Sequence, residues 1–89
     1  RPMILTEEER KEVDKSNMAI NAFCEALKAK MNKSTIEKGR RGWDDPDDVS
    51  NETLTEMMKE HIEKGDMRDV ALFAMMIWFR ESNLSNFEK

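Results

Sequence analysis

Four acidic residues in the second half of the chain have the spacing of metal-binding carboxylates. Glu60 and Glu63 are three residues apart, and Asp66 and Asp69 repeat that spacing directly after them. Residues three apart share one face of a helix, and carboxylate oxygens are ligands that Mg²⁺ prefers. If two antiparallel helices brought both pairs together, these residues could hold Mg²⁺ for hydrolysis of a nucleotide.

The same carboxylates are also explained by the positions that they occupy in the helices. Only Lys64 and Gly65 separate the two pairs, so Glu63 ends one predicted helix and Asp66 is placed to cap the next. A chain with 19 acidic residues contains such pairs by chance. Caps and solvated charge, with no cofactor, are therefore the first interpretation, and Mg²⁺ is the alternative. His61 lies on the apolar side of its predicted helix, where we expect a partly buried core histidine.

A second concentration of reactive residue types lies in the stretch KGRRGWDDPDDVS, residues 38–50. The guanidinium groups of two arginines could bind phosphate or carboxylate, and the tryptophan could stack on a ligand. The competing interpretation is a packed crossover loop in which the tryptophan closes one end of the core. The predicted binding residues are Arg40, Arg41, Trp43, Asp44, Asp45 and Asp47.

Helical periodicity predicts the elements that position these residues, and it predicts an all-α fold. The sequence TEEE at Thr6 is a capping box that opens a helix reaching about Ile36. A second helix follows Ser50 and ends at Gly65, and a third begins at once after Asp66. The expected architecture is a long N-terminal helix, a Trp- and Asp-rich connector and a C-terminal helical hairpin.

The third predicted helix is apolar around almost its whole circumference. Between Met67 and Phe79 only Arg68 and Asp69 are polar. Two other helices from an 89-residue chain are not expected to cover every face, so we expect self-association into a helical-bundle dimer or higher oligomer. The residues assigned to that interface are Leu72, Met75, Met76 and Phe79.

Length and composition limit the classes of function. The chain is long enough for one domain, which we expect to span 1–89 with frayed ends at 1–5 and 83–89. A net charge of −4 argues against nonspecific binding to nucleic acid, and no apolar run is long enough to cross a membrane. Cys24 falls in an apolar pattern, so a buried structural thiol in a reducing compartment is expected. Acidic mimicry of nucleic acid is an alternative that depends on a short array: Glu7, Glu8, Glu9, Glu12 and Asp14.

Three segments form a pattern that covers most of the chain: FCEALKAKM, KGRRGWDDP and LTEMMKEHIEKGDMRDVALFAMMIWFR. This pattern resembles small accessory early-region proteins of lambda-like phages and prophages. The resemblance implies a phage or prophage origin and a place in the cytoplasm of the bacterial host, and it carries no active-site residues. A weaker similarity links KGDMRDVALFAMMIW to the MazG-like all-α pyrophosphohydrolases, in which most of a helical hairpin separates the two acidic pairs.

These observations lead to one expected function and two alternatives. We expect a non-enzymatic helical homodimer or higher oligomer that binds a host or phage protein. Acidity, methionine content and the apolar third helix support this expectation. The alternatives are a Mg²⁺-dependent nucleotide pyrophosphohydrolase that uses Glu60, Glu63, Asp66 and Asp69, and the acidic mimic of nucleic acid.

Overall fold

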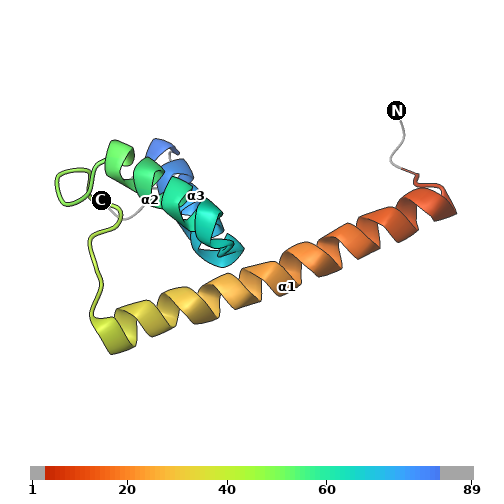
Figure 1. Ribbon diagram of the computed structural model, residues 1–89. Coiled ribbons are helices and arrows are strands. Elements are labelled where there is room, and N and C mark those ends of the chain that lie inside the picture. Colours follow the sequence, from red (N-terminus) through yellow and green to blue (C-terminus); the bar gives the residue numbers. More distant parts are fainter. Residues whose placement is uncertain (1–3, 83–89) are drawn as a thin grey trace.

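The computed structural model describes residues 4–82 and confirms the all-α prediction. Its helices are α1 (Glu7–Lys38), α2 (Asn51–Lys64) and α3 (Met67–Glu81). Figure 1 shows α2 and α3 side by side as a hairpin, with α1 running past the hairpin as one continuous rod. The helix α3 packs against both α1 and α2. Most of the predicted frayed ends, 1–3 and 83–89, lie outside the described residues.

The predicted capping box is confirmed at the start of α1, whereas the helix ends two residues later than expected. The Thr6 hydroxyl accepts a hydrogen bond from the Glu9 amide at 3.1 Å, and the Glu9 carboxylate accepts one from the Thr6 amide at 2.9 Å. The helix continues past Ile36 to Lys38, because Gly39 supplies the left-handed residue with φ of 66° that ends it.

The hairpin is built from local signals that the sequence carries. Ser50 caps α2 by accepting from the Thr53 amide at 3.1 Å, and Gly65 ends that helix with φ of 76°. Asp66 then caps α3 through the Asp69 amide, at 3.4 Å. Capping by a short polar side chain and a left-handed glycine satisfies backbone groups that helix ends leave without partners. The tight reversal at Gly65 was therefore predictable.

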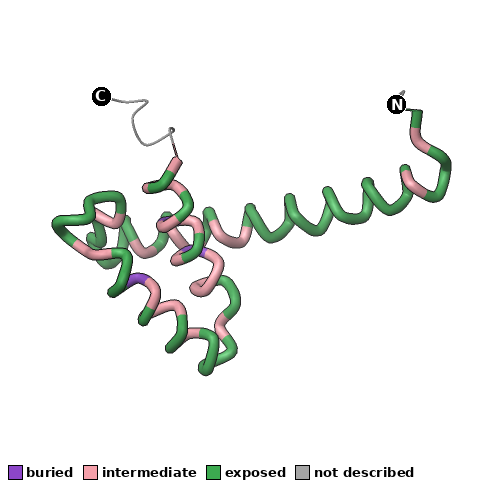
Figure 2. The backbone as a smooth tube through the Cα atoms, turned by 90° about the horizontal axis from the view of Figure 1, so that it is seen from above, coloured by how far each residue is buried: buried purple, intermediate pink, exposed green. Residues whose placement is uncertain are grey.

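The core of the described chain is small and lies where the hairpin, the connector and the second half of α1 meet. Within residues 4–82, the buried hydrophobic side chains are Leu54, Leu72 and Met76. Figure 2 shows these buried positions only in the hairpin, with intermediate exposure around them. The partly buried side chains packed against them are Leu27, Met31, Trp43, Val49, Phe73, Met75 and Ile77.

This core corrects part of the predicted oligomer interface. Leu72 and Met76 are 7% and 8% exposed in a single chain, because α3 turns this face towards α1 and α2. They are therefore not available to a second copy. Met75 and Phe79 are only half-buried, so their assignment stays a prediction. The apolar residues that α3 leaves outside are instead Met67, Ala74 and Trp78.

The first half of α1 has no cover from the rest of the described chain. Residues 10–25 are all exposed, and the apolar side chains among them include Val13, Ile20 and Phe23. Cys24 is exposed as well, so the expected buried thiol is wrong. The longest dimension of the molecule is 48 Å, the length of a 32-residue helix at about 1.5 Å per residue.

Within residues 4–82, none of the helices combines the length and apolar content that crossing a bilayer requires.

Candidate functional site

A groove of about 790 Å³ lies between the second half of α1, the connector and the hairpin. It opens beside the core, so several core side chains form its floor. Because α1 meets the hairpin only through α3, the space between α1 and α2 is left for this groove. The apolar side chains of the floor that remain partly exposed are Met31, Trp43, Val49, Met57 and Phe73, and the buried Leu54, Leu72 and Met76 lie beneath them.

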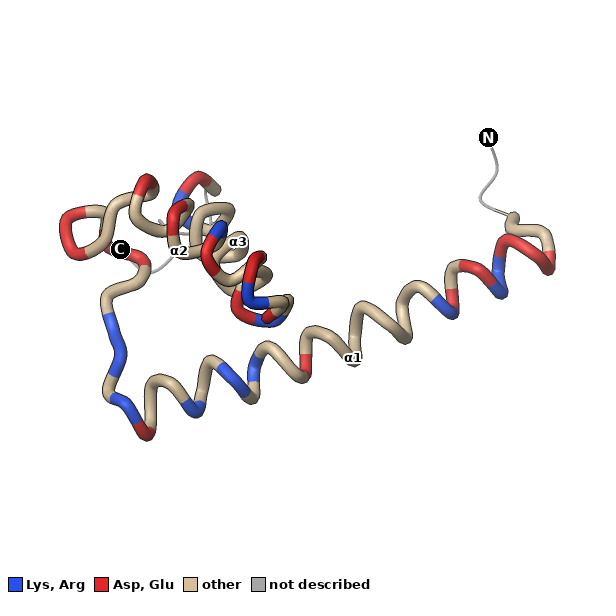
Figure 3. The backbone as a smooth tube through the Cα atoms, viewed as in Figure 1, with Lys and Arg blue, Asp and Glu red and all other residues tan. Residues whose placement is uncertain are grey.

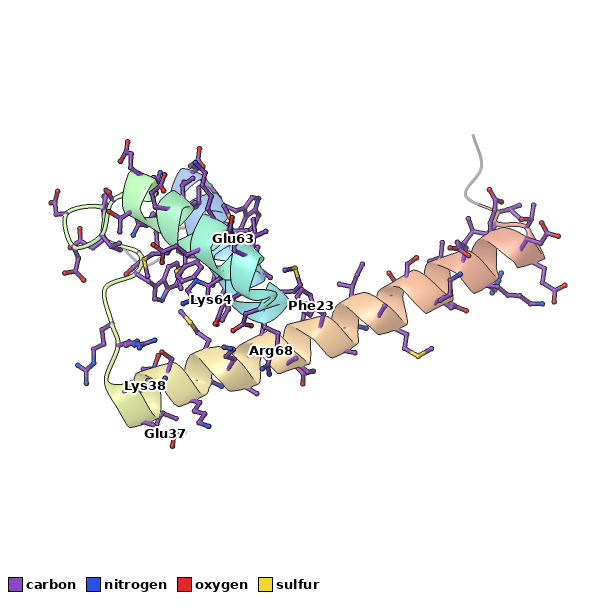
Figure 4. All side chains as sticks on the ribbon, in the orientation of Figure 1. Phe23, Glu37, Lys38, Glu63, Lys64 and Arg68 are labelled. Carbon is purple, nitrogen blue, oxygen red and sulfur yellow. The ribbon has the colours of Figure 1, made fainter. Side chains whose placement is uncertain are left out.

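The rim of the groove is basic, although the whole chain carries a net charge of −4. Figure 3 shows Lys and Arg gathered along the second half of α1 and the start of the connector. In Figure 4, Lys38 lies at the end of α1 and Arg68 projects from the start of α3 towards α1. We call the following five exposed residues the cationic rim: Lys33, Lys38, Arg40, Arg41 and Arg68.

The cationic rim has no internal counter-charge in the described part of the chain. None of the five side chains makes an ion pair with another residue between 4 and 82. The carboxylates that line the groove are Asp48 and Asp69, and Lys30 already pairs with Asp69 at 3.1 Å. The groove therefore presents a positive potential to any ligand that approaches its floor.

An ion-pair network holds α1 against the start of α3. The Lys30 Nζ atom lies 3.2 Å from Oδ2 of Asp66 and 3.1 Å from Oδ1 of Asp69. A hydrogen bond with the Asp69 side chain, followed by one with Lys30, lowers the pKa of Asp66 to about 2. The hydrogen bond that Lys30 donates to the Asp69 carboxylate, together with a weaker effect of its bond to Asp66, raises the pKa of Lys30. The charged forms are thus the ones that the fold favours.

His61 is the partly buried histidine that the sequence predicts. Its Nδ1 atom lies 2.7 Å from the Met57 carbonyl oxygen, which can only accept, so Nδ1 donates. The Nε2 atom is 3.6 Å from Oδ2 of Asp69, and the ring lies 5.1 Å from that of Phe73. These contacts tie α2 to α3 and extend the Lys30 network across the hairpin.

The two acidic pairs of the Mg²⁺ alternative do not converge. Asp66 and Asp69 face Lys30, whereas Glu60 and Glu63 stand on the outer surface of α2. Among the described residues, no group of three or more His, Cys, Asp or Glu side chains could hold a metal ion. The reversal at Gly65 explains the separation, because α3 leaves it with its first turn directed at α1.

The connector is held in place by Arg80, which sequence reasoning missed. Its Nε atom donates to the Trp43 carbonyl oxygen at 2.8 Å, Nη2 donates to the same oxygen, and Nη1 donates to Oδ1 of Asn51 at 3.0 Å. The Trp43 ring packs on the core and meets Phe79 edge-on, with centroids 5.4 Å apart. Trp43 thus closes one end of the core and also lines the groove.

The predicted aspartates lie outside the groove and shape the connector. Asp44, Asp45 and Asp47 are exposed, and the Asp45 carboxylate accepts from the Asp47 amide at 2.9 Å. Just before them, Gly42 has φ of 82°, and a side chain there would collide with the carboxylate of Asp48. Of the six predicted binding residues, the structure brings Arg40, Arg41 and Trp43 to the groove.

Sequence reasoning also missed two members of the cationic rim, Lys33 and Arg68. Lys33 and Lys38 lie on α1, and Arg68 is the basic residue in the first turn of α3. The basic composition of residues 28–41 was a usable signal, because it contrasts with the acidic start of the same helix. Their convergence with Arg68 depends on how the connector folds back, which no local pattern encodes.

Comparison with family models, with curated proteins and with solved structures found no match to this chain.

Proposed function

We propose that this chain is a non-enzymatic protein-binding module that takes an acidic amphipathic helix of its partner into the groove. One observation carries the proposal: an apolar floor bounded by five exposed cations that have no ion pair within residues 4–82. In keeping with the sequence pattern, the partner is a protein of the bacterial host or of a phage.

The two parts of the groove select different features of the partner. The apolar floor gains free energy when it is removed from water, as does the apolar face of a helix laid into it. The cationic rim then meets carboxylates on the flanks of that helix and speeds association by long-range attraction. Trp43 and Arg41 provide residue types that are common at the energetic centres of interfaces.

The floor favours a helix over a nucleotide or a nucleic acid. A phosphate ligand would use the rim and leave the apolar floor uncovered, apart from stacking on Trp43. An acidic amphipathic helix uses both parts, because its apolar face covers the floor and its carboxylates meet the rim.

Fluorescence titration tests the proposal. In a Trp78→Phe background Trp43 is the remaining tryptophan, so its emission reports on the groove. The probe is a synthetic amphipathic helix with leucine on one face and glutamate on the other, and a matched peptide carries lysine in place of each glutamate. We expect saturable binding of the acidic peptide, weakened by salt, and none of the basic one.

Charge reversal supplies the matched control. Arg40→Glu with Arg41→Glu should weaken acidic-peptide binding by at least about tenfold, because it reverses the rim beside Trp43. Lys59→Glu with Lys64→Glu makes the same charge change on the outer surface of α2 and should leave binding unchanged. Equal effects of the two double variants, or equal binding of both peptides, would refute the proposal. Rim-dependent binding of inorganic pyrophosphate, with neither peptide bound, would instead indicate a phosphate site.

A further inference from the structure

The exposed first half of α1 has the properties of the ligand that the groove selects. Val13, Ile20 and Phe23 continue the face on which Leu27 and Met31 meet the hairpin, yet they are 43%, 58% and 41% exposed. Figure 4 shows Phe23 beside the tip of the hairpin, where the covered part of α1 gives way to the bare part. The exposed apolar face is therefore continuous with an interface that the chain already makes.

The charges of α1 are divided between its two halves. Residues 7–14 contain five acidic and two basic side chains, whereas residues 28–41 contain six basic side chains and one acidic. The acidic half is the projecting one, and the basic half forms a wall of the groove. The molecule thus has an acidic apolar arm and a basic apolar groove, and Figure 1 shows the arm pointing away from the hairpin.

We propose that two copies of this chain form an antiparallel dimer in which the projecting half of α1 from each copy occupies the groove of the other. This inference rests on the proposed function of the groove and names one occupant of it. A two-fold axis near Phe23 makes the exchange reciprocal, so both arms and both grooves are used.

The register of this pairing follows from the positions of the charges. Glu8 and Lys38 are equally far along the chain from Phe23, so an antiparallel pair centred there places them opposite each other. In the same register Glu12 of one copy approaches Lys33 of the other. A parallel pair would place the acidic first turns side by side, which like charges oppose.

Charge reversal in two separate chains tests this arrangement. The arm variant carries Glu8→Lys and Glu12→Lys, and the groove variant carries Lys33→Glu and Lys38→Glu. All four positions are exposed, so circular dichroism should show both variants folded. In sedimentation experiments on the wild-type chain we expect a dimer that weakens with salt, and for each variant alone at least a tenfold higher dissociation constant. Mixed together, the variants should form a heterodimer, because both arm–groove contacts are then complementary.

Cysteine crosslinking tests the direction and the register. In a Cys24→Ser background, one chain carries Glu12→Cys and the other Ser34→Cys, two positions equally far from Phe23 and on its side of α1. The antiparallel dimer predicts an efficient crosslink between the two chains by a short bismaleimide. A mixture of Glu12→Cys with Lys59→Cys, which lies on the outer surface of α2, is the matched control and should not crosslink.

The outcomes separate this inference from the function proposed for the groove. A wild-type chain that stays monomeric at high concentration overturns the dimer, as does a dimer that both charge variants retain. If the acidic peptide binds in either case, the groove keeps its proposed function. If the peptide binds and also dissociates the dimer, both proposals are supported, because one groove then serves two occupants.

Discussion

Both halves of α1 carry the same apolar stripe, but the rest of the chain covers only the second half. Leu27 and Met31 in the second half pack against the core, whereas Val13 and Ile20 in the first half remain exposed. Both halves are nevertheless helical. Local interactions are sufficient for helix formation in both halves. A capping box, a left-handed terminal glycine and ion pairs such as Lys15–Glu12 at 2.9 Å stabilise the helix.

Helix formation and burial are separate outcomes of this sequence. Within α1 no residue is fully buried, so the rod is long without being part of a deep core. The free energy of tertiary packing comes instead from the hairpin and the connector. Changes in those two regions should therefore be costly, and matched changes on the bare half of α1 should be mild.

The largest expected effect is that of Leu54→Ala, which would abolish the contrast between the two halves. Leu54 is 2% exposed, and truncating a buried leucine costs about 2–5 kcal/mol of unfolding free energy. Because the core is small, Leu27 and Met31 should then lose their cover, and hydrogen exchange in both halves of α1 should become equally fast. Urea unfolding followed by circular dichroism, together with hydrogen exchange, measures both effects.

Met18→Ala is the matched control for that experiment. Met18 is 70% exposed on the first half of α1, and we expect its truncation to change the unfolding free energy by less than about 0.5 kcal/mol. Equal losses from the two substitutions would mean that the first half is packed as well.

A smaller effect is expected from Arg80→Ala, which releases the connector from α3. Arg80 donates hydrogen bonds to the Trp43 carbonyl and to Asn51, and bonds from a charged donor contribute about 1.5–3 kcal/mol. The variant should lose stability and shift the Trp43 emission, since the ring is no longer held against Phe79. Arg68→Ala, which removes an exposed arginine from the same helix, should leave stability and emission nearly unchanged.

The smallest effect concerns the ion pairs that join the covered half of α1 to α3. Asp66 has a pKa of about 2, below its ordinary value of 3.8, so its charged form stabilises the fold above about pH 4. That contribution is lost as the pH falls from about 4 through 2. Asp66→Asn keeps the helix cap but removes the charge. The stability difference between wild type and variant should therefore be constant near neutral pH and shrink in acid.

Acid unfolding of Lys30→Met provides the control for the pH experiment. This variant removes the cation that Asp66 and Asp69 share, so its stability should depend less on acid than that of the wild type. A pH dependence that persists in both variants would assign the acid sensitivity to other carboxylates.

Local signals made the fold predictable from the sequence. Thr6, Ser50 and Asp66 cap the helices as expected, and Gly39 and Gly65 end them. Each of these features depends on residues a few positions apart. The helix continues past its predicted end at Ile36, because the chain carries no helix breaker before Gly39.

The candidate site was predictable only in part, because it depends on contacts distant in sequence. Arg40, Arg41 and Trp43 were found from their types, but Arg80 meets Trp43 across 37 residues. The face of α3 that is buried was assigned wrongly for Leu72 and Met76. An almost wholly apolar helix gives no polar side to orient it, so only the positions of α1 and α2 decide which face is covered.

Gly42 limits which amino-acid substitutions the connector can accept. Its backbone conformation is one that residues with a side chain rarely adopt, and the Asp48 carboxylate occupies the place where a β-carbon would go. The conformation of the loop before Trp43 thus depends on a residue that has no side chain to pack in the core. In a saturation mutagenesis screen for stability, position 42 should tolerate side chains less well than its neighbours in the loop, which marks a constraint that hydrophobicity alone would overlook.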